Sequence, residues 1–448
     1  MKINAEQRHL GGGVEEGTGF SWIFAQASVI GRQEPAVSSA DKAVLRELAR
    51  KVKQLSELPV QQERKTLWTN HHSLKQTVPP IFIDPELAWY ELLPADNLRC
   101  KGNLARIWEF KLLKEIFWQE HICDDRVCRA VVPVQHVFQE TGFGIEKNLI
   151  GGEGNGAYKI NSALTDYDDM SKLTYRRIEI DEAKTDRLLE TAHDVFDGIL
   201  EVYVENAWWY SFGLTVDAVL LRGFENFLYD IYDHPDELHA LMRFLSDEAM
   251  CRLDFLERSG LLSLNNGGEF MGTGGYGWCD ELPGEPFVPA RVAPHNMWGY
   301  SESQETVSVS PEAFDEFVLA YQLPLLSRFG LNAYGCCEPL DSRVGLLMKK
   351  IPRLRKITVS PWSDVRMMAE QIGKDYVFCW KMNPSYIAFE KIDEEAIRAC
   401  AREALTVTQK HGCPTEVLMR DIRTLAGRKE NAVRWVEIMR EEAARLYG

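Results

Sequence analysis

Short apolar segments alternate with longer amphipathic segments over most of this 448-residue chain, and no other feature constrains the fold as much. The apolar runs have strand length, whereas the longer segments repeat their apolar residues with helical spacing. This alternation favours parallel strands joined by helices. The expected strands span 78–83, 130–138, 200–204, 261–264, 297–301, 331–336, 356–359, 376–380 and 417–419, and the expected helices span 235–258, 311–329, 364–373, 394–409 and 429–446.

Two architectures suit such a chain: an open doubly wound sheet and a closed eight-stranded barrel. The sequence has no glycine-rich phosphate loop after the first expected strand. Its one GxGxxG match, Gly272 to Gly277, precedes a polar segment instead of an apolar helix. Polar and aromatic residues follow the ends of several different strands, where a barrel builds its site. We therefore predict an α/β fold, a (β/α)₈ TIM barrel over residues 76–448.

Residues 1–75 are predicted to be an N-terminal extension of that barrel. The glycine-rich start, 1–19, predicts a flexible tail. Apolar residues recur with helical spacing from Val44 to Leu55, which predicts an accessory helix within 39–68, capped by Ser39 or Asp41.

The net charge limits which partners we expect, and the cysteine content limits which cellular compartment we expect. The chain has 51 Lys and Arg against 67 Asp and Glu, a formal net charge of −16, which repels phosphate backbones and anionic membrane surfaces. No apolar run approaches the roughly 20 residues of a membrane span, and the start is too polar for a secretory signal. Ten cysteines in so long a chain do not resemble a disulfide scaffold. We predict a cytoplasmic protein with no nucleic-acid or membrane partner, and a homodimer is left open.

The segment from Tyr334 to Pro339 is the sharpest chemical feature of the sequence. Strand alternation would place Tyr334, Cys336 and Glu338 on one face, turned towards the barrel mouth. A thiolate and a carboxylate this close suit Zn²⁺. The thiols could instead be small buried hydrophobes, but a carboxylate there must be exposed, paired or coordinated. The pattern predicts a metal site that includes Cys336, Cys337 and Glu338.

Four further residues complete the candidate chemistry. Cys379 and Lys381 share a face of the strand near 376–380, so Cys379 is a further candidate metal ligand, although a core cysteine beside a lysine fits equally well. His295 is a candidate general acid or ligand, or a hydrogen-bonded turn residue. Glu302 is a candidate for binding substrate or orienting a ligand, or a solvated loop carboxylate. Glu302, His295 and Lys381 form the candidate catalytic set.

Aromatic residues follow or lie on the same expected strands. Large aromatic side chains beside flexible loops can cover a flat or cationic ligand, or they can fill the barrel. The candidate substrate-binding residues are Trp208, Tyr210, Trp298, Tyr300 and Tyr334.

On these residues the chain resembles the uroporphyrinogen decarboxylase-like superfamily, over roughly residues 200–448. Its zinc-dependent corrinoid methyltransferases carry a His-x-Cys-Gly-Asp type motif whose histidine and cysteine bind zinc. Here Tyr334 stands at the histidine, Cys336 at the cysteine and Glu338 at the acidic residue. Any metal must therefore recruit other groups, for which Cys337, Glu338, Cys379 and His295 are candidates.

The resemblance implies a substrate-side methyltransferase. Such an enzyme would demethylate a small methylated compound, an aryl methyl ether or a methylated amine, and pass the methyl group to a corrinoid protein, with zinc as Lewis acid. Two alternatives are a metal-free decarboxylase or lyase of the same barrel, which would use Glu302, Lys381 and His295 as acid–base groups, and a non-catalytic module that binds a tetrapyrrole or a corrinoid partner.

Overall fold

The computed structural model describes residues 35–146, 148–151, 158–272, 274–285, 287–289 and 291–448. The predicted tail, 1–19, lies outside these residues, as does Thr273 in the GxGxxG segment. The helices are α3 (Ser39–Ser56), α4 (Pro59–His72), α5 (Trp89–Leu92), α6 (Asn103–Phe117), α7 (Glu182–Phe196), α8 (Thr215–Arg222), α9 (Phe224–Asp233), α10 (Pro235–Arg258), α11 (Pro311–Phe314), α12 (Ala320–Leu326), α13 (Val344–Lys350), α14 (Val365–Ile372), α15 (Glu394–Lys410) and α16 (Glu430–Tyr447). The strands are β1 (Ile81–Ile83), β2 (Val131–Val134), β3 (Phe138–Glu140), β4 (Asn148–Gly151), β5 (Tyr158–Asn161), β6 (Ile178–Ile180), β7 (Glu201–Val204), β8 (Trp298–Ser301), β9 (Leu331–Tyr334), β10 (Leu354–Val359), β11 (Val377–Lys381) and β12 (Thr415–Met419).

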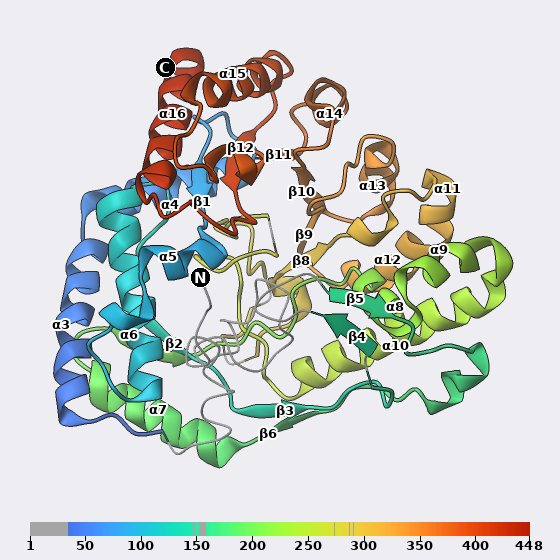
Figure 1. Ribbon diagram of the computed structural model, residues 1–448, viewed down its shortest axis with the longest axis horizontal. Helices are drawn as coiled ribbons and strands as arrows, with labels where there is room; N and C mark the ends of the chain where they lie inside the picture. Colours follow the sequence, from blue (N-terminus) through green and yellow to red (C-terminus); the bar gives the residue numbers. More distant parts are fainter. Residues whose placement is uncertain (1–34, 147, 152–157, 273, 286, 290) are drawn as a thin grey trace.

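A parallel six-stranded sheet, in the order β1-β12-β11-β10-β9-β8, forms the centre of the fold. Strands β2 and β7 form a separate parallel pair, and β3 with β6 and β4 with β5 form antiparallel pairs. Helices α13 to α16 lie outside the six-stranded sheet (Figure 1). The fold is therefore mixed α/β with parallel strands, as predicted.

Closure into a barrel stays a prediction, because no ladder in the described part of the chain joins the β2–β7 pair to the six-stranded sheet. The expected strand 261–264 forms no ladder. The residue after it reaches β8 through its side chain: the Asn265 amide donates to the Trp298 carbonyl (2.9 Å), and its oxygen accepts from the Trp298 N–H (2.8 Å). A polar side chain thus holds this segment beside β8 in place of strand pairing.

Two predicted helices differ from the structure in detail. Helix α10 has the predicted bounds. The helix expected over 311–329 runs without a gap from Pro311 to Leu326, as α11, a π-helical stretch at Asp315–Leu319, and α12, which contains Pro324. The accessory helix within 39–68 is two helices, α3 and α4, and Pro59 begins the second. Ser38 caps α3, since its hydroxyl accepts from the Asp41 N–H.

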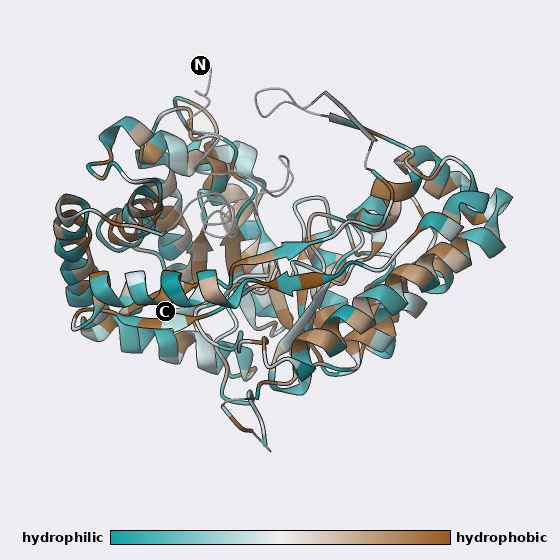
Figure 2. Cartoon of the chain, turned by 90° about the horizontal axis from the view of Figure 1, so that it is seen from below, coloured by the Kyte–Doolittle hydropathy of each residue, from teal (hydrophilic) through white to brown (hydrophobic). Residues whose placement is uncertain are grey.

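The interior has two main apolar clusters. The larger one surrounds the six-stranded sheet, and its strands β10, β11 and β12 are buried on both faces, as parallel strands between helices usually are. The second joins α3, α6, α7 and β2 through residues such as Leu45, Trp108, Val132 and Leu188. Figure 2 shows hydrophobic colouring on the inner strands and mixed colouring on the helices around them. Helix α3 is therefore packed onto the β2 side of the fold, whereas Trp68 of α4 belongs to the larger cluster.

The two faces of the six-stranded sheet differ in what covers them. Residues paired in the ladders share a face, and one such set is Tyr300, Ala333, Lys356, Cys379, Glu416 and Leu418. Residues on both sides of Thr273 cover this face: Phe270 and Tyr276 contact Phe82, and the Lys356 ammonium donates to the Gly274 carbonyl (2.7 Å). We call this the inner face, and the helices cover the outer face.

Tyr334 lies on the outer face, so the predicted common face for Tyr334, Cys336 and Glu338 is wrong. Its hydroxyl donates to the Gln322 amide oxygen on α12 (2.9 Å) and lies 3.2 Å from the Ser303 hydroxyl, which can donate to it. The physical reason is that β9 ends at Tyr334 and Gly335 follows with φ +103°, where a Cβ would lie 2.8 Å from a methyl carbon of Leu340. Strand alternation stops at this glycine, and the next residues turn to the edge of the sheet.

No helix in the described ranges combines the length and the apolar character that crossing a membrane would need.

Candidate functional site

Polar side chains gather where the parallel strands end. Because the strands are parallel, their carboxyl ends lie at one edge, as in other α/β folds. The residues at this edge are Asp84 after β1, Gln135 after β2, Glu205 after β7, Glu302 after β8, Cys336 just beyond β9, Lys381 at the end of β11, and Arg420 and Asp421 after β12.

A cavity of about 300 Å³ lies between α6, β2 and the segment that follows β7, and it extends to β8. Its volume is at the small end of the range for small-molecule sites. Aromatic side chains form much of its wall, and they include four of the five predicted substrate-binding residues: Trp208, Tyr210, Trp298 and Tyr300. The fifth, Tyr334, does not line it.

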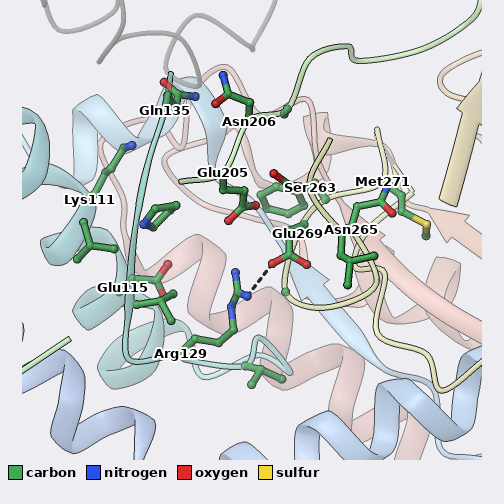
Figure 3. Close-up of a pocket in the computed structure, with 18 of the residues that line it drawn as sticks. Lys111, Glu115, Arg129, Gln135, Glu205, Asn206, Ser263, Asn265, Glu269 and Met271 are labelled. Carbon is green, nitrogen blue, oxygen red and sulfur yellow. Dashed lines mark ion pairs between the residues drawn. The ribbon is translucent and has the colours of Figure 1, made fainter. Parts of the chain in front are cut away.

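Two carboxylates and an arginine lie together in this cavity (Figure 3). Glu269 forms an ion pair with Arg129 (2.6 Å), and the Tyr203 hydroxyl donates to Glu205 (2.7 Å). Burial and the like charge of Glu269 raise the pKa of Glu205 to about 7, although Tyr203, Arg129 and Lys111 act in the opposite direction. Glu205 therefore changes its charge near neutral pH.

Lysines of α6 enter the same cavity. Burial, together with the like charge of Lys114, lowers the pKa of Lys111 to about 8, and Glu205 opposes this shift. Burial also lowers the pKa of Lys114 to about 8, although Asp84 stabilises its charge. In Figure 3, Lys111 reaches inward from α6, on the other side of the cavity from Glu269. A carboxyl group and an amine that both titrate near neutrality are typical of an active site.

A thiol cluster adjoins the cavity through Tyr210. The Tyr210 hydroxyl lies 3.5 Å from the Cys336 sulfur, which lies 3.5 Å from the Cys337 sulfur. The Cys337 thiol in turn donates to Asp421 (3.5 Å), and the Lys381 ammonium lies 3.8 Å from the same carboxylate. Tyr210 therefore faces both the cavity and the thiols.

Lys381 is a buried cation in this cluster, with 2% of its surface exposed. Its ammonium has no hydrogen-bond partner among the described residues, although Asp421 lies within ion-pair distance. Burial lowers the pKa of Lys381, but Cys336, Asp421 and Cys337 outweigh this effect, and the net shift is upward. Lys381 is therefore a fixed positive charge beside the two thiols.

The two carboxyl groups predicted at this edge are held by the chain itself. Glu338 accepts from the backbone N–H groups of Cys336 (2.9 Å) and Ser303 (3.0 Å), and burial raises its pKa to about 7. Glu302 accepts from the Ser211 hydroxyl (3.1 Å), and burial with the charges of Glu305 and Glu338 raises its pKa well above the usual range. Glu338 thus fixes the turn after β9, which explains a buried carboxylate there without a metal.

Cys379 and His295 are not brought to the thiol cluster. Cys379 is buried on the inner face, where burial and the charge of Glu416 raise the pKa of its thiol. Glu416 also pairs with Lys356 (2.8 Å) and lies 3.3 Å from the ring nitrogens of His71 and His72. His295 is exposed and precedes β8, at the opposite end of that strand from Glu302.

The described side chains therefore do not fit the predicted zinc ion. Among them, no three His, Cys, Asp or Glu residues form a group that could hold a metal. Cys336 and Cys337 are adjacent, but Glu338 is engaged by backbone donors, Cys379 lies on the inner face, and the Lys381 cation lies beside Asp421. Zinc binding stays a prediction that metal analysis can test.

Sequence reasoning missed the charged groups of the cavity. Glu205 is not among the predicted site residues, although its place directly after β7 was a usable signal. Lys111 lies on a helix and Glu269 in a loop, and neither position carries a motif. Only the packing of α6 against β2 brings these groups to one cavity.

No protein-family model matches the chain, and no curated protein matches it. Among solved structures, the chain is similar to a methyltransferase from Methanosarcina mazei, with 10% sequence identity and a TM-score of 0.44. That match covers 86% of this chain and 99% of the other.

Proposed function

We propose that this chain is a methyltransferase that takes a methyl group from a small methylated compound in the cavity and passes it to a corrinoid carried by a partner protein. The sequence resemblance suggests the reaction. The observation that carries the proposal is the cavity itself, which combines aromatic walls with a carboxyl group and an amine, Glu205 and Lys111, that titrate near neutrality. This combination is typical of a catalytic site.

The proposed reaction is a displacement at carbon. The bond from the methyl carbon to its oxygen or nitrogen breaks, its electron pair stays on that atom, and the acceptor supplies the pair for the new bond. The aromatic walls would hold the methyl group in line with the acceptor and exclude water. Lys111 can give a proton to a leaving oxygen, and ionised Glu205 attracts a cationic methyl donor. No step in this proposal passes through zinc, because the described donors do not fit the ion.

A second candidate is a metal-free decarboxylase or lyase, which the position of Lys381 favours. Its ammonium is buried beside Cys336 and Asp421 without a hydrogen bond among the described residues. A fixed cation of this kind would stabilise the negative charge left on carbon when carbon dioxide departs. Glu302, with its raised pKa, could return the proton. His295 does not contribute to this candidate, because it lies at the other end of β8.

Turnover assays distinguish these candidates. The protein is incubated with methyl ethers and methylated amines in the presence of free cob(I)alamin, and loss of the cob(I)alamin absorbance is followed. We expect methylation that depends on Glu205, with an activity loss of about 100-fold in Glu205→Gln. Carbon dioxide release from carboxylic acids that disappears in Lys381→Met would support the second candidate instead. Absence of both reactions, with retained binding of a corrinoid protein, would favour the non-catalytic module.

Elemental analysis of the purified protein tests the zinc prediction separately. About one zinc ion per chain, lost in the Cys336→Ser variant, would support a metal held by the thiol cluster. A zinc content near zero in protein with intact thiols would contradict it.

A further inference from the structure

Two primary amides lie together at one end of the cavity. Gln135 follows β2 and Asn206 follows β7, and both side chains line the cavity. The ladder between these strands ends with Val134 beside Val204, and the Glu205 N–H donates to the Val134 carbonyl (2.8 Å). Figure 3 accordingly shows the two amides next to each other. The pairing of β2 with β7 therefore fixes their places in the cavity wall.

The chain also fixes which end of the Asn206 amide faces a ligand. The Asn206 oxygen accepts from the His136 backbone N–H (2.8 Å) and lies 2.8 Å from Nδ1 of the His136 ring. A backbone N–H can only donate, so the oxygen of the amide, and not its NH₂ group, must face His136. A ligand would therefore meet the NH₂ group of Asn206, which is a donor.

Gln135 supplies an acceptor beside that donor. It has 7% of its surface exposed, and its amide oxygen has no hydrogen-bond partner among the described residues. Buried polar groups in folded proteins are nearly always hydrogen-bonded. An N–H group of a ligand at this end of the cavity would give the Gln135 oxygen a donor.

A firmly held aromatic wall adjoins the two amides. Trp208 lies two residues after Asn206 and lines the cavity. Its indole N–H donates to the Leu261 carbonyl (2.7 Å), and its ring packs against His136 and Phe138. Further aromatic side chains form much of the cavity wall, and such walls suit the face of a flat ring. The cavity thus combines aromatic faces with a neutral donor and a neutral acceptor.

We propose that the cavity binds a small flat heterocycle with a lactam edge, in which a ring N–H and a ring C=O are neighbours. The N–H donates to Gln135, and the C=O accepts from Asn206. A lactam ring holds both groups on one side, whereas an open-chain secondary amide is trans and points them in opposite directions. This inference rests on the proposed function only for the fate of a methyl group carried elsewhere on the ring.

Binding to the full-length protein, measured by isothermal titration calorimetry without any acceptor for a methyl group, tests the inference. The main probe is 2-quinolinone, a flat lactam of two rings with a single hydrogen-bonding edge. Its analogue 1-methyl-2-quinolinone keeps the C=O but lacks the N–H, and quinoline keeps the two rings but lacks the lactam. We expect 2-quinolinone to bind at least about tenfold more tightly than either analogue. Equal or tighter binding of an analogue, or no binding of 2-quinolinone, would overturn the inference.

Variants assign the two groups of the lactam edge. Gln135→Met removes the acceptor and should abolish the preference over 1-methyl-2-quinolinone, whereas Gln135→Glu keeps an acceptor oxygen and should retain that preference. Asn206→Asp keeps an oxygen for His136 but loses the NH₂ group, so it should weaken 2-quinolinone at least about tenfold and leave quinoline unchanged. Gln62→Met, at an exposed glutamine on α4, is the matched control and should bind all three probes like the unchanged protein.

Thermal melting shows which variants are folded. Unchanged binding of 2-quinolinone in folded Gln135→Met and Asn206→Asp would overturn the assignment. If a variant does not fold, the three probes on the unchanged protein still decide the inference.

The two proposals can fail separately. If 2-quinolinone binds as expected but no methyl ether or methylated amine gives a methyl group to cob(I)alamin, the proposed function fails while the ligand class stands. If 2-quinolinone does not bind and a methyl donor without a lactam edge is turned over, the ligand class fails while the proposed function stands.

Discussion

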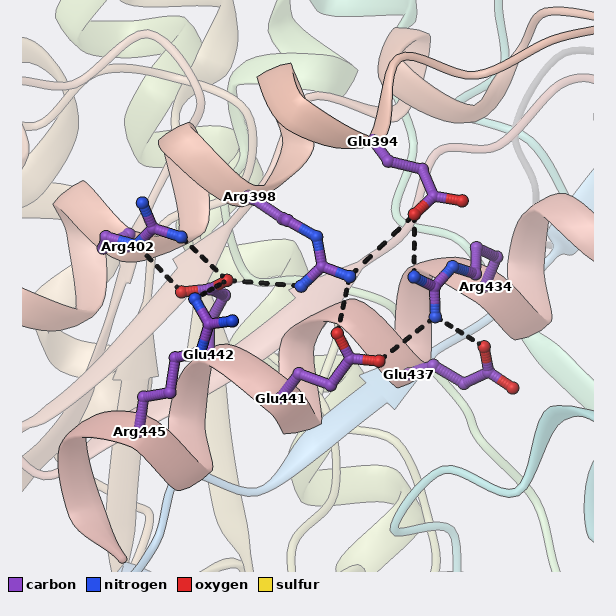
Figure 4. Close-up of polar contacts among 8 residues, drawn as sticks. All are labelled: Glu394, Arg398, Arg402, Arg434, Glu437, Glu441, Glu442 and Arg445. Carbon is purple, nitrogen blue, oxygen red and sulfur yellow. Dashed lines mark hydrogen bonds and ion pairs between the residues drawn. The ribbon is translucent and has the colours of Figure 1, made fainter.

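Two clusters of charged side chains, the cavity and the contact between α15 and α16, use similar residues with opposite results. Between α15 and α16, Glu442 accepts from Arg398, Arg402 and Arg445, and Arg434 bridges Glu394, Glu437 and Glu441 (Figure 4). Hydrogen bonds from these arginines lower the pKa values of Glu394, Glu441 and Glu442. In the cavity, burial and a like charge raise the pKa of Glu205 to about 7.

The comparison shows what distinguishes a structural cluster of charges from a reactive one. The number of charges does not matter; what matters is whether each charged group has a partner of opposite charge and remains in contact with water. Most of the side chains between α15 and α16 remain in contact with water, and each carboxylate there has an arginine partner. The lowered pKa values keep Glu394, Glu441 and Glu442 ionised over the physiological range. Glu205 and Lys111 exchange protons near neutrality because the cavity withdraws water from them.

The largest expected effect is on turnover. Replacing Glu205 by Gln removes the carboxylate charge of this residue from the cavity, so we expect kcat/KM for methyl transfer to fall about 100-fold. Glu437→Gln makes the same chemical change between α15 and α16 and should leave kcat/KM unchanged. Equal kcat/KM values for the two variants would show that the cavity and the contact between α15 and α16 do not differ in their effect on turnover.

The pH dependence of turnover sharpens the comparison. Glu205 must be ionised and Lys111 protonated, and their pKa values are about 7 and about 8, so kcat/KM should rise as pH approaches 7 and fall above 8. Glu269, Tyr203, Arg129 and Lys114 also act on these two groups and set the width of the profile. Glu205→Gln should abolish the acidic limb. A flat profile between pH 6 and 9 would show that neither group titrates in the reaction.

A smaller effect is expected on stability when the cavity loses its arginine. Arg129→Met would leave Glu269 without its partner and Glu205 beside a less compensated carboxylate, so the free energy of unfolding should fall by about 2 kcal/mol. Urea denaturation measures this change. The pKa of Glu205 should rise further in the variant, which would move the acidic limb of the activity profile to higher pH. An unchanged free energy of unfolding would contradict the role of Arg129.

The smallest effect is expected from the matched change between the helices. Arg402→Met removes one of three arginines around Glu442, and half of the Arg402 side chain is already exposed. We expect a melting temperature within about 1 °C of the unchanged protein, because exposed pairs contribute little. A loss as large as that in Arg129→Met would mean that the two clusters do not differ in the way described.

The sequence predicted those features that depend on local patterns. The bounds of α10 were correct because Pro235 begins the helix and the apolar spacing persists to its end. Strands β8 and β10 to β12 were placed to within a few residues because each contains apolar or aromatic residues in a run of strand length. The π-helical stretch Asp315–Leu319, within the helix expected over 311–329, was not predicted.

The candidate site was predicted less well because its geometry depends on tertiary contacts. Trp208, Tyr210, Trp298 and Tyr300 line the cavity, since they follow or lie on strands that end there, and their role in binding substrate stays a prediction. The face of Tyr334 was wrong, because one left-handed glycine ends strand alternation. Lys111 could not be found from its helix alone, since a lysine among apolar residues usually marks a solvated surface.

The packing of α3 against α6 has a consequence for the position of Lys111 in the cavity. Leu45 and Leu48 of α3 share an apolar cluster with Trp108 and Leu112 of α6, on either side of Lys111 in the sequence. The position of Lys111 therefore depends on a helix that itself lines the cavity only through Val52. If α3 were removed or exchanged for another helix, Lys111 would shift. The first measurable effect would be a loss of specificity at the cavity, before any loss of the central sheet.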